Sequence, residues 1–236
     1  MKKFYTLASA RKTDEGYVVQ LDGKSVKTPS GQLLLAPSQA LADAVVGDWA
    51  GQGDEVRHET MPLTALLNTA IDRARDRESI TASLMKYLDT DLLCYRVKEP
   101  EVLAARQKDI WDKWLAWFDD HFEVPLDITF GLEALTQDEG AHRRVWNYIE
   151  GLDEYYFAIL HVVTALAGSV VLGLAFVEGE ITPDELFEAH WLEEKYHAEL
   201  AGEADYGDDP VIAKKQAAMR VELEAAQRFL DHLNAE

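Results

Sequence analysis

The strongest restriction on the fold comes from YYFAILHVVTALAGSVVLGLAFV at 155–177, a run that contains no Asp, Glu, Lys or Arg. A run of this length is sufficient to cross a lipid bilayer as a helix. However, acidic Glu154 and Glu178 flank it, no basic flank marks a cytoplasmic side, and His161 interrupts it. Gly168-Ser169 in its middle suits a break between helices. We therefore expect two buried helices that meet near Gly168-Ser169, and no membrane insertion.

The charge balance of the whole chain narrows the choice of partners. Lys and Arg number 23 against 43 Asp and Glu, which gives a formal net charge of −20 at pH 7. Nucleic acids and anionic membranes are bound through basic patches, so this balance argues against both. A basic protein partner is compatible with it. Cys94 is the one cysteine, so an internal disulfide is impossible and a reducing compartment is the simplest setting.

The hydrophobic pattern changes along the chain from alternating to helical. Residues 4–36 contain short strand-like stretches, separated by the turn signals Asp22-Gly23 and Pro29-Ser30-Gly31. Helical periodicity follows and dominates the rest of the chain. The pattern predicts an α+β fold in two domains: a small mixed N-terminal domain of β-hairpins plus helices at 1–98, and an all-α C-terminal helical domain at 99–236.

Two short segments fit more than one kind of structure. Residues 91–97 could form a strand or a helix end, and 124–131 a strand or an extended arm. Further on, one helix is expected over 183–205, and a long final helix should begin at Asp209-Pro210.

The stretch HWLEEKYHAE at 190–199 holds the most notable group of polar side chains. His190, Glu193, Glu194 and His197 recur at helical spacing and would share one helix face. The remaining charged residues of this segment cluster on the opposite, solvated face. We therefore expect the four side chains to point inward or toward a partner, because inward charges are costly unless they are paired.

The spacing Glu194-x-x-His197 also occurs in di-iron carboxylate proteins. The alternative hypothesis is therefore a carboxylate/histidine metalloenzyme that uses this pair. Glu139-x-x-His142 and Glu55-x-x-His58 repeat the spacing, but one begins a helix and the other follows a loop glycine. Phosphate-binding and nucleophile-elbow motifs do not occur in the sequence. Cys94 has no histidine near it in sequence, so we expect a buried structural thiol. No metal, cofactor or catalytic residue is expected.

Two stretches combine apolar residues with a carboxylate and an arginine. They contain Asp72 with Arg73, and Asp91 with Arg96. Buried charges need partners, so we expect Arg96 or Arg73 to form an ion pair with Asp72 or Asp91.

Several stretches together resemble one family, the assembly chaperones of the F-type ATP synthase catalytic head that act on its α subunit. The matching stretches are LDGKSVKTPSGQLLLAPSQALADAVVGDWAGQ (21–52), MPLTALLNTAIDR (61–73), YLDTDLLCYR (87–96), Trp111-Asp112, Gly168-Ser169 and LEEKYHAELAG (192–202). The motif positions are Trp49, Met61, Pro62, Leu63, Thr64, Asp72, Asp91, Cys94, Tyr95, Arg96, Gly168 and Ser169. MPLT…TAID followed by TDLLCYR is the most specific part.

The resemblance implies a two-domain chaperone without catalysis or metal, which holds the unassembled α subunit until β subunits join. Glu194 matches the position of an important family glutamate, which implies partner binding there, with Glu193, His190 and His197 beside it. His197 and Ala201 depart from the family, which usually has glutamine and tryptophan at these positions. Mitochondrial members carry a transit peptide, whereas strand signals begin here within the first residues, so a bacterial cytoplasmic protein is expected.

Overall fold

The structure is a computed structural model that describes residues 1–73, 76–131, 133–202 and 210–235. The chain forms two compact units. The first comprises Met1–Asp76, Asp153–Ile159 and Val221–Glu236, and the second comprises Arg77–Leu152 and Leu160–Arg220. Helices α6 (Glu154–Ala167) and α11 (Pro210–Leu233) contribute residues to both units.

The first unit begins with a small antiparallel sheet of strands β1 (Ala8–Thr13), β2 (Gly16–Leu21), β3 (Lys24–Ser25) and β4 (Leu35–Ala36). Strand β2 is central and pairs with each of the other three. Asp22 and Gly23 connect β2 to β3 with positive φ angles of 48° and 78°, as the tight hairpin turn predicted from Asp-Gly requires.

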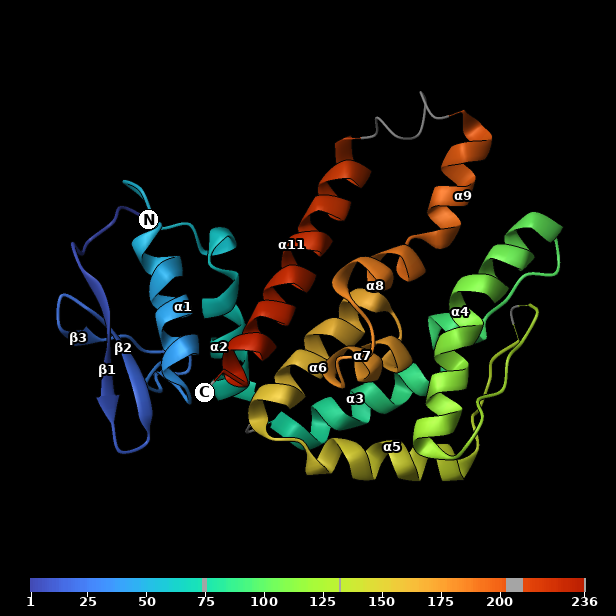
Figure 1. Cartoon of the computed structure of the whole chain (residues 1–236), viewed down its shortest axis with the longest axis horizontal. Coiled ribbons are helices and arrows are strands. Elements are labelled where there is room, and N and C mark those ends of the chain that lie inside the picture. The colour runs from blue at the N-terminus through green and yellow to red at the C-terminus, as the bar shows by residue number, and fades with distance from the viewer. Residues whose placement is uncertain (74–75, 132, 203–209, 236) are drawn as a thin grey trace. The chain divides into compact units, whose positions relative to one another are not determined.

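Helices complete the first unit beside the sheet (Figure 1). Helix α1 (Gln39–Ala50) packs on β1 and β2, and a short 3-10 helix, η1 (His58–Thr60), precedes helix α2 (Pro62–Arg73). Ser38 caps α1 by accepting a hydrogen bond from the Leu41 amide. The core between these elements consists of fully buried apolar side chains, among them Val18, Val19, Leu34, Leu41, Val45, Leu63 and Leu67.

The second unit is helical. In chain order it contains α3 (Arg77–Asp89), the 3-10 helix η3 (Leu92–Cys94), α4 (Glu101–Phe122), α5 (Glu139–Gly151), most of α6, α7 (Val170–Val177), α8 (Pro183–His190), α9 (Leu192–Ala201) and the start of α11. Helix α7 is buried along its whole length and packs against α3, α4 and α8. It is therefore the hydrophobic centre of this unit.

The uncharged run folds as the two buried helices expected from its flanks. Helix α6 ends at Ala167, Gly168 adopts a positive φ of 65°, and Ser169 caps α7 by accepting a hydrogen bond from the Leu172 amide at 3.0 Å. Among the helices that the structure describes, none combines the length and apolar character that crossing a membrane requires.

The α+β class and the order of sheet and helices are confirmed. Residues 92–94 form a 3-10 helix, and 124–131 is an extended arm in which Thr129 bridges in parallel to Tyr95. The compact units differ from the expected division at 98, because α3 packs against α5 and α7 and so joins the helical unit.

Candidate functional site

The HWLEEKYHAE stretch lies on two helices rather than on the single helix expected over 183–205, of which 203–205 are outside the described residues. Helix α8 starts with a capping box between Thr182 and Glu185 and ends at His190. Trp191, with φ −88° and ψ 13°, separates it from α9. The expectation that all four polar residues share one helical face is therefore wrong, since the helical register is interrupted after His190.

His190 faces the interior of the second unit. Its Nδ1 lies 3.0 Å from the carbonyl oxygen of Ala167, the last residue of α6. Its ring meets the Trp191 indole edge to face at 5.3 Å. The indole Nε1 in turn contacts the Met219 sulfur at 3.2 Å. These contacts hold the junction of α8 and α9 in place.

Glu193 is also tied to the interior. Its Oε1 accepts a hydrogen bond at 2.5 Å from Nε2 of Gln107, which is 1% exposed. Gln107 accepts a second bond from the Val97 amide at 2.9 Å. Glu193 thus links α9 to α4 through the buried side-chain amide of Gln107. Its carboxylate therefore has a structural role.

Glu194 and His197 point outward, so of the two directions expected, inward or toward a partner, only the second remains open to them. Both side chains are exposed, and neither forms a hydrogen bond or ion pair with another described residue. The inner face of α9 is formed by Leu192 and Tyr196, which are 3% and 5% exposed. Because these anchors fix the helix, Glu194 and His197 are presented on a rigid element and are free to contact a partner.

Metal binding would require more ligands than this pair supplies. Structural and catalytic metal sites use three or four protein ligands that converge on one point. Within the described ranges, no three His, Cys, Asp or Glu side chains gather in this way. His142, from a second Glu-x-x-His spacing, instead contacts the Asp89 carboxylate at 2.9 Å.

Motif residues from distant parts of the sequence meet around Asp91, which is fully buried. One carboxylate oxygen accepts from the Leu93 amide at 3.0 Å, and the other from the Val171 amide at 3.1 Å. The Leu92 amide donates to the Gly168 carbonyl at 3.1 Å. Burial raises the pKa of Asp91 to about 6, although hydrogen bonds from Val171 and Leu93 oppose the rise. Asp91 thereby joins η3 to the N-terminus of α7.

Arg96 pairs with neither Asp72 nor Asp91, the two carboxylates expected as partners of Arg96 or Arg73. It forms an ion pair with Asp112 at 3.0 Å, and its guanidinium lies 5.0 Å from the Trp111 ring centre. Its Nε donates to the Leu93 carbonyl at 2.5 Å. The expected pairing of Arg96 with Asp91 is therefore wrong, because backbone amides satisfy the Asp91 carboxylate. Cys94 is buried as expected, and burial raises the pKa of its thiol well above the usual range.

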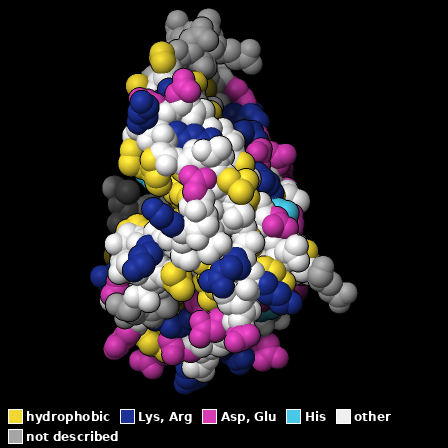
Figure 2. Space-filling view, turned by 90° about the vertical axis from the view of Figure 1, so that its left-hand side faces the viewer, with side chains coloured by type: hydrophobic (Ala, Val, Ile, Leu, Met, Phe, Trp, Pro, Cys, Tyr) yellow, Lys and Arg dark blue, Asp and Glu magenta, His cyan; other side chains and the backbone are white. Residues whose placement is uncertain are grey.

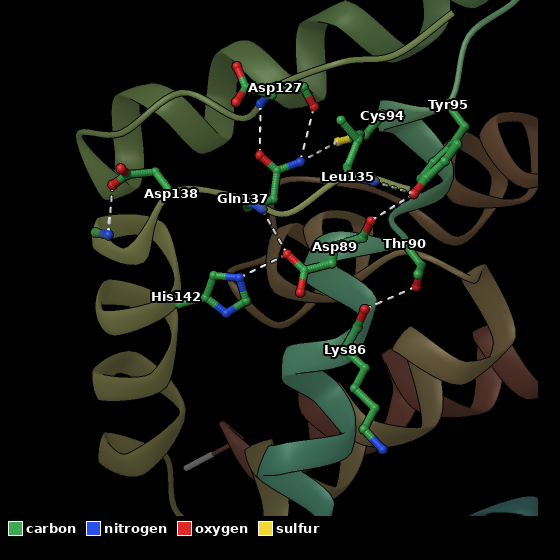
Figure 3. A network of polar contacts seen from close by, with 11 residues as sticks. Lys86, Asp89, Thr90, Cys94, Tyr95, Asp127, Leu135, Gln137, Asp138 and His142 are labelled. Carbon is green, nitrogen blue, oxygen red and sulfur yellow. Dashed lines mark hydrogen bonds and ion pairs between the residues drawn. The ribbon is translucent and has the colours of Figure 1, made fainter. Parts of the chain in front are cut away.

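A polar network centred on Gln137 fixes the extended arm against η3, as Figure 3 shows. The Gln137 side chain accepts from the Asp127 amide at 2.8 Å and donates to the Asp127 carbonyl at 3.0 Å. Its backbone amide donates to Asp89 at 2.8 Å. The Tyr95 hydroxyl oxygen accepts a hydrogen bond from the Leu135 backbone amide at 3.2 Å. Sequence reasoning did not single out Gln137, which belongs to none of the matching stretches, or Asp89, which lies within YLDTDLLCYR but was not among the motif positions.

The motif residues of the first unit are structural in their contacts. Asp48 accepts hydrogen bonds from the backbone amide and hydroxyl of Thr64 at 2.8 and 3.0 Å, which joins α1 to the start of α2. The Trp49 carbonyl accepts from Tyr5 at 2.6 Å. Asp72 accepts from the amide and hydroxyl of Ser30 at 3.1 and 2.5 Å. Met61 and Leu63 lie in the core, and Pro62 begins α2.

Comparison with known proteins gives a consistent result. Residues 2–119 match a family model described as ATP12 chaperone protein. The mitochondrial protein atp12 of Schizosaccharomyces pombe is 26% identical over 208 residues, which cover 82% of this chain and 72% of that protein. The mitochondrial protein ATP12 of Saccharomyces cerevisiae is 22% identical over 274 residues, which cover 97% and 84%.

Two solved structures match nearly the whole chain. The crystal structure of Atp12 from Paracoccus denitrificans has a TM-score of 0.88 and 29% identity, covering 99% of this chain and 98% of that one. The Atu1473 protein of Agrobacterium tumefaciens has a TM-score of 0.90 and 33% identity, covering 99% and 86%.

Proposed function

The chain belongs to the ATP12 chaperone family, and on this basis we propose that it binds the unassembled α subunit of the F-type ATP synthase catalytic head and prevents its aggregation until β subunits join. Family membership supports the coarser statement, that the chain is an assembly chaperone of ATP synthase. The choice of the α subunit rests on the resemblance of the motif residues. A bacterial cytoplasmic location is part of the same proposal.

The physical task of such a chaperone sets the kind of interface it needs. A free subunit exposes apolar surfaces that the assembled head later buries, and such surfaces cause aggregation. The chaperone must cover one of them and still release it, which a moderate and partly polar interface permits. The net charge of −20 would accelerate capture of a partner with basic patches and oppose self-association.

The proposed binding site rests on the difference between the exposed and the buried faces of α9. Glu194 and His197 are exposed and have no hydrogen-bond or ion-pair partner among the described residues, while Leu192 and Tyr196 anchor the helix. We assign Glu194 and His197 to direct contact with the α subunit. His190 and Glu193 would support that contact indirectly, because their internal hydrogen bonds fix the ends of α8 and α9.

A binding role is proposed in place of a catalytic one. The support for this is membership in a chaperone family, together with the separate structural roles of the titratable motif residues. Asp91 caps a buried helix and Cys94 is enclosed with a raised thiol pKa, so neither is presented to a substrate.

Charge reversal at Glu194 tests the proposed site. Glu194→Lys should reduce co-purification of the α subunit at least tenfold, because it places like charges together where a basic group is expected. The matched control is Glu150→Lys, which reverses an exposed carboxylate on α5. Circular dichroism should show both variants folded. Equal capture by Glu194→Lys and the control would remove α9 from the site.

A further inference from the structure

Strand β1 is an edge strand with one unused side. Its six residues pair in register with β2, from Ala8 opposite Leu21 to Thr13 opposite Gly16. Strands β3 and β4 both pair with β2 and leave β1 at the end of the sheet. No other strand in the described part of the chain pairs with β1. Its outer side therefore offers backbone groups to a further strand.

The segment that forms the first strands of the sheet is basic in a strongly acidic protein. Residues 1–28 contain six basic residues and three acidic ones, whereas the whole chain has 23 and 43. The six basic residues are Lys2, Lys3, Arg11, Lys12, Lys24 and Lys27. Figure 2 shows Lys and Arg side chains spread over the face on the sheet side, interspersed with hydrophobic ones and with Asp and Glu side chains, which are most numerous at its lower end. We define this group of six residues as the basic sheet surface.

The basic sheet surface is not neutralised from within the described residues. None of its six side chains forms an ion pair there, whereas the second unit pairs Arg106 with Glu199 and Lys113 with Glu185. The nearby carboxylate of Asp22 is already engaged, because it accepts from the Thr6 and Leu7 amides at 3.1 and 2.9 Å. Lys3 Nζ donates to the Gln52 carbonyl at 2.9 Å, and Lys12 Nζ lies 5.8 Å from the centre of the Tyr17 ring. The positive charges therefore have contacts within the first unit, but no carboxylate forms an ion pair with them among the described residues.

Exposed apolar groups stand at the start of the same edge. Phe4 and Leu7 are 63% and 62% exposed, immediately before β1. An extended segment added to β1 would have its backbone bound by the strand edge and its acidic side chains beside either Arg11 or Lys12, which project from opposite faces of the sheet. Apolar side chains at its end could lie beside Phe4 and Leu7.

We propose that β1 and the basic sheet surface bind an extended, acidic segment of a partner protein by strand addition. Charge complementarity selects this occupant, since the edge supplies hydrogen bonds to any strand, and Arg11 and the lysines favour a negatively charged one. A basic edge that merely prevents sheet-to-sheet association would present the same residues without binding such a segment. The inference goes beyond the proposed function, and its test does not use the α subunit.

The test measures binding of a synthetic octapeptide of alternating Glu and Val to the full chain. Fluorescence anisotropy gives the affinity, and NMR hydrogen exchange locates the contact. We expect slower exchange of amides in Ala8–Thr13 and weaker binding at high salt, where charges are screened. A peptide of alternating Glu and Pro carries the same charge but lacks half the backbone donors, so it should bind at least tenfold more weakly.

Variants separate this surface from the general charge of the protein. Arg11→Glu/Lys12→Glu should weaken octapeptide binding at least tenfold, and Arg11→Gln/Lys12→Gln serves if the first variant does not fold. The control Lys108→Glu/Arg143→Glu changes two exposed residues of the helical unit by the same charge and should bind normally. Absence of binding, equal binding of the Glu-Pro peptide, or binding of anionic lipid vesicles but not the octapeptide would each overturn the proposal.

Discussion

The Asp91 carboxylate accepts a hydrogen bond from the Val171 backbone amide at 3.1 Å across 80 positions of sequence. This bond attaches η3 to the N-terminus of the most buried helix of the second unit. Asp91→Ala would leave the Val171 and Leu93 amides without that acceptor, so it should lower the free energy of unfolding by about 1–3 kcal/mol. Chemical denaturation checks this, and an unchanged midpoint would contradict it.

The raised pKa of Asp91 predicts how the free energy of unfolding depends on pH. The pKa of Asp91 is about 6 when folded, above its ordinary value of 3.8, so the folded state binds the proton more tightly between these values. The stability that Asp91 contributes should therefore be greatest below pH 4 and decline as pH rises toward 6. Asp91→Asn should lack this decline. Denaturation of both proteins from pH 4 to 7 tests it, and parallel stability curves would refute the assignment.

Gly173 on α7 should not tolerate a side chain. A Cβ atom there would overlap Thr164 Oγ1 and lie 3.3 Å from the Thr164 amide nitrogen on α6. Gly173→Ala should therefore lower stability by about 1–3 kcal/mol through overpacking. Gly47→Ala is the matched control, because its Cβ would meet nothing within 4 Å on α1 and should be neutral or stabilising. The melting temperature should fall for Gly173→Ala and stay unchanged or rise for Gly47→Ala; equal shifts would contradict the packing argument.

Gln137 should control the order of the extended arm. Gln137→Ala removes the hydrogen bonds to both backbone groups of Asp127. Stability should fall by about 1–3 kcal/mol, and hydrogen exchange should accelerate at Asp127 and Thr129 before the rest of the unit opens. Gln39→Ala, an exposed glutamine of α1, should change neither measurement. Unaltered exchange along the arm in Gln137→Ala would show that other contacts hold it.

The sequence was sufficient where local signals decide the structure. Gly168-Ser169 combines a residue that adopts positive φ with a helix cap, so the break between α6 and α7 could be predicted. Asp22-Gly23 specified its hairpin for the same reason.

Other features depend on residues far apart in sequence and could not be read from local patterns. Trp191 is compatible with a helix interior, and the helix break beside it accompanies tertiary contacts of Trp191 with Met219 and of His190 with Ala167. The charges of Asp91 and Arg96 suggested a pair, but each is satisfied by partners from other elements. Consequently the motif residues were identified and their contacts were not, and the sequence left open whether Glu194 faces inward or toward a partner.

Metal removal distinguishes the chaperone from the metalloenzyme alternative. Extensive treatment with a chelator should leave both the folding and the client binding of the protein unchanged, because Glu194 and His197 lack converging ligands among the described residues. Elemental analysis of untreated protein is the direct check. Stoichiometric iron, manganese or zinc, together with loss of binding on its removal, would contradict the account.

The most direct measurement follows the aggregation of purified α subunit by light scattering, in the absence of β and with increasing amounts of the chain. The account predicts that a near-stoichiometric amount suppresses the scattering of α, that Glu194→Lys does so poorly, and that subsequent addition of β restores assembly. Undiminished scattering of α in the presence of the folded chain would contradict the central claim.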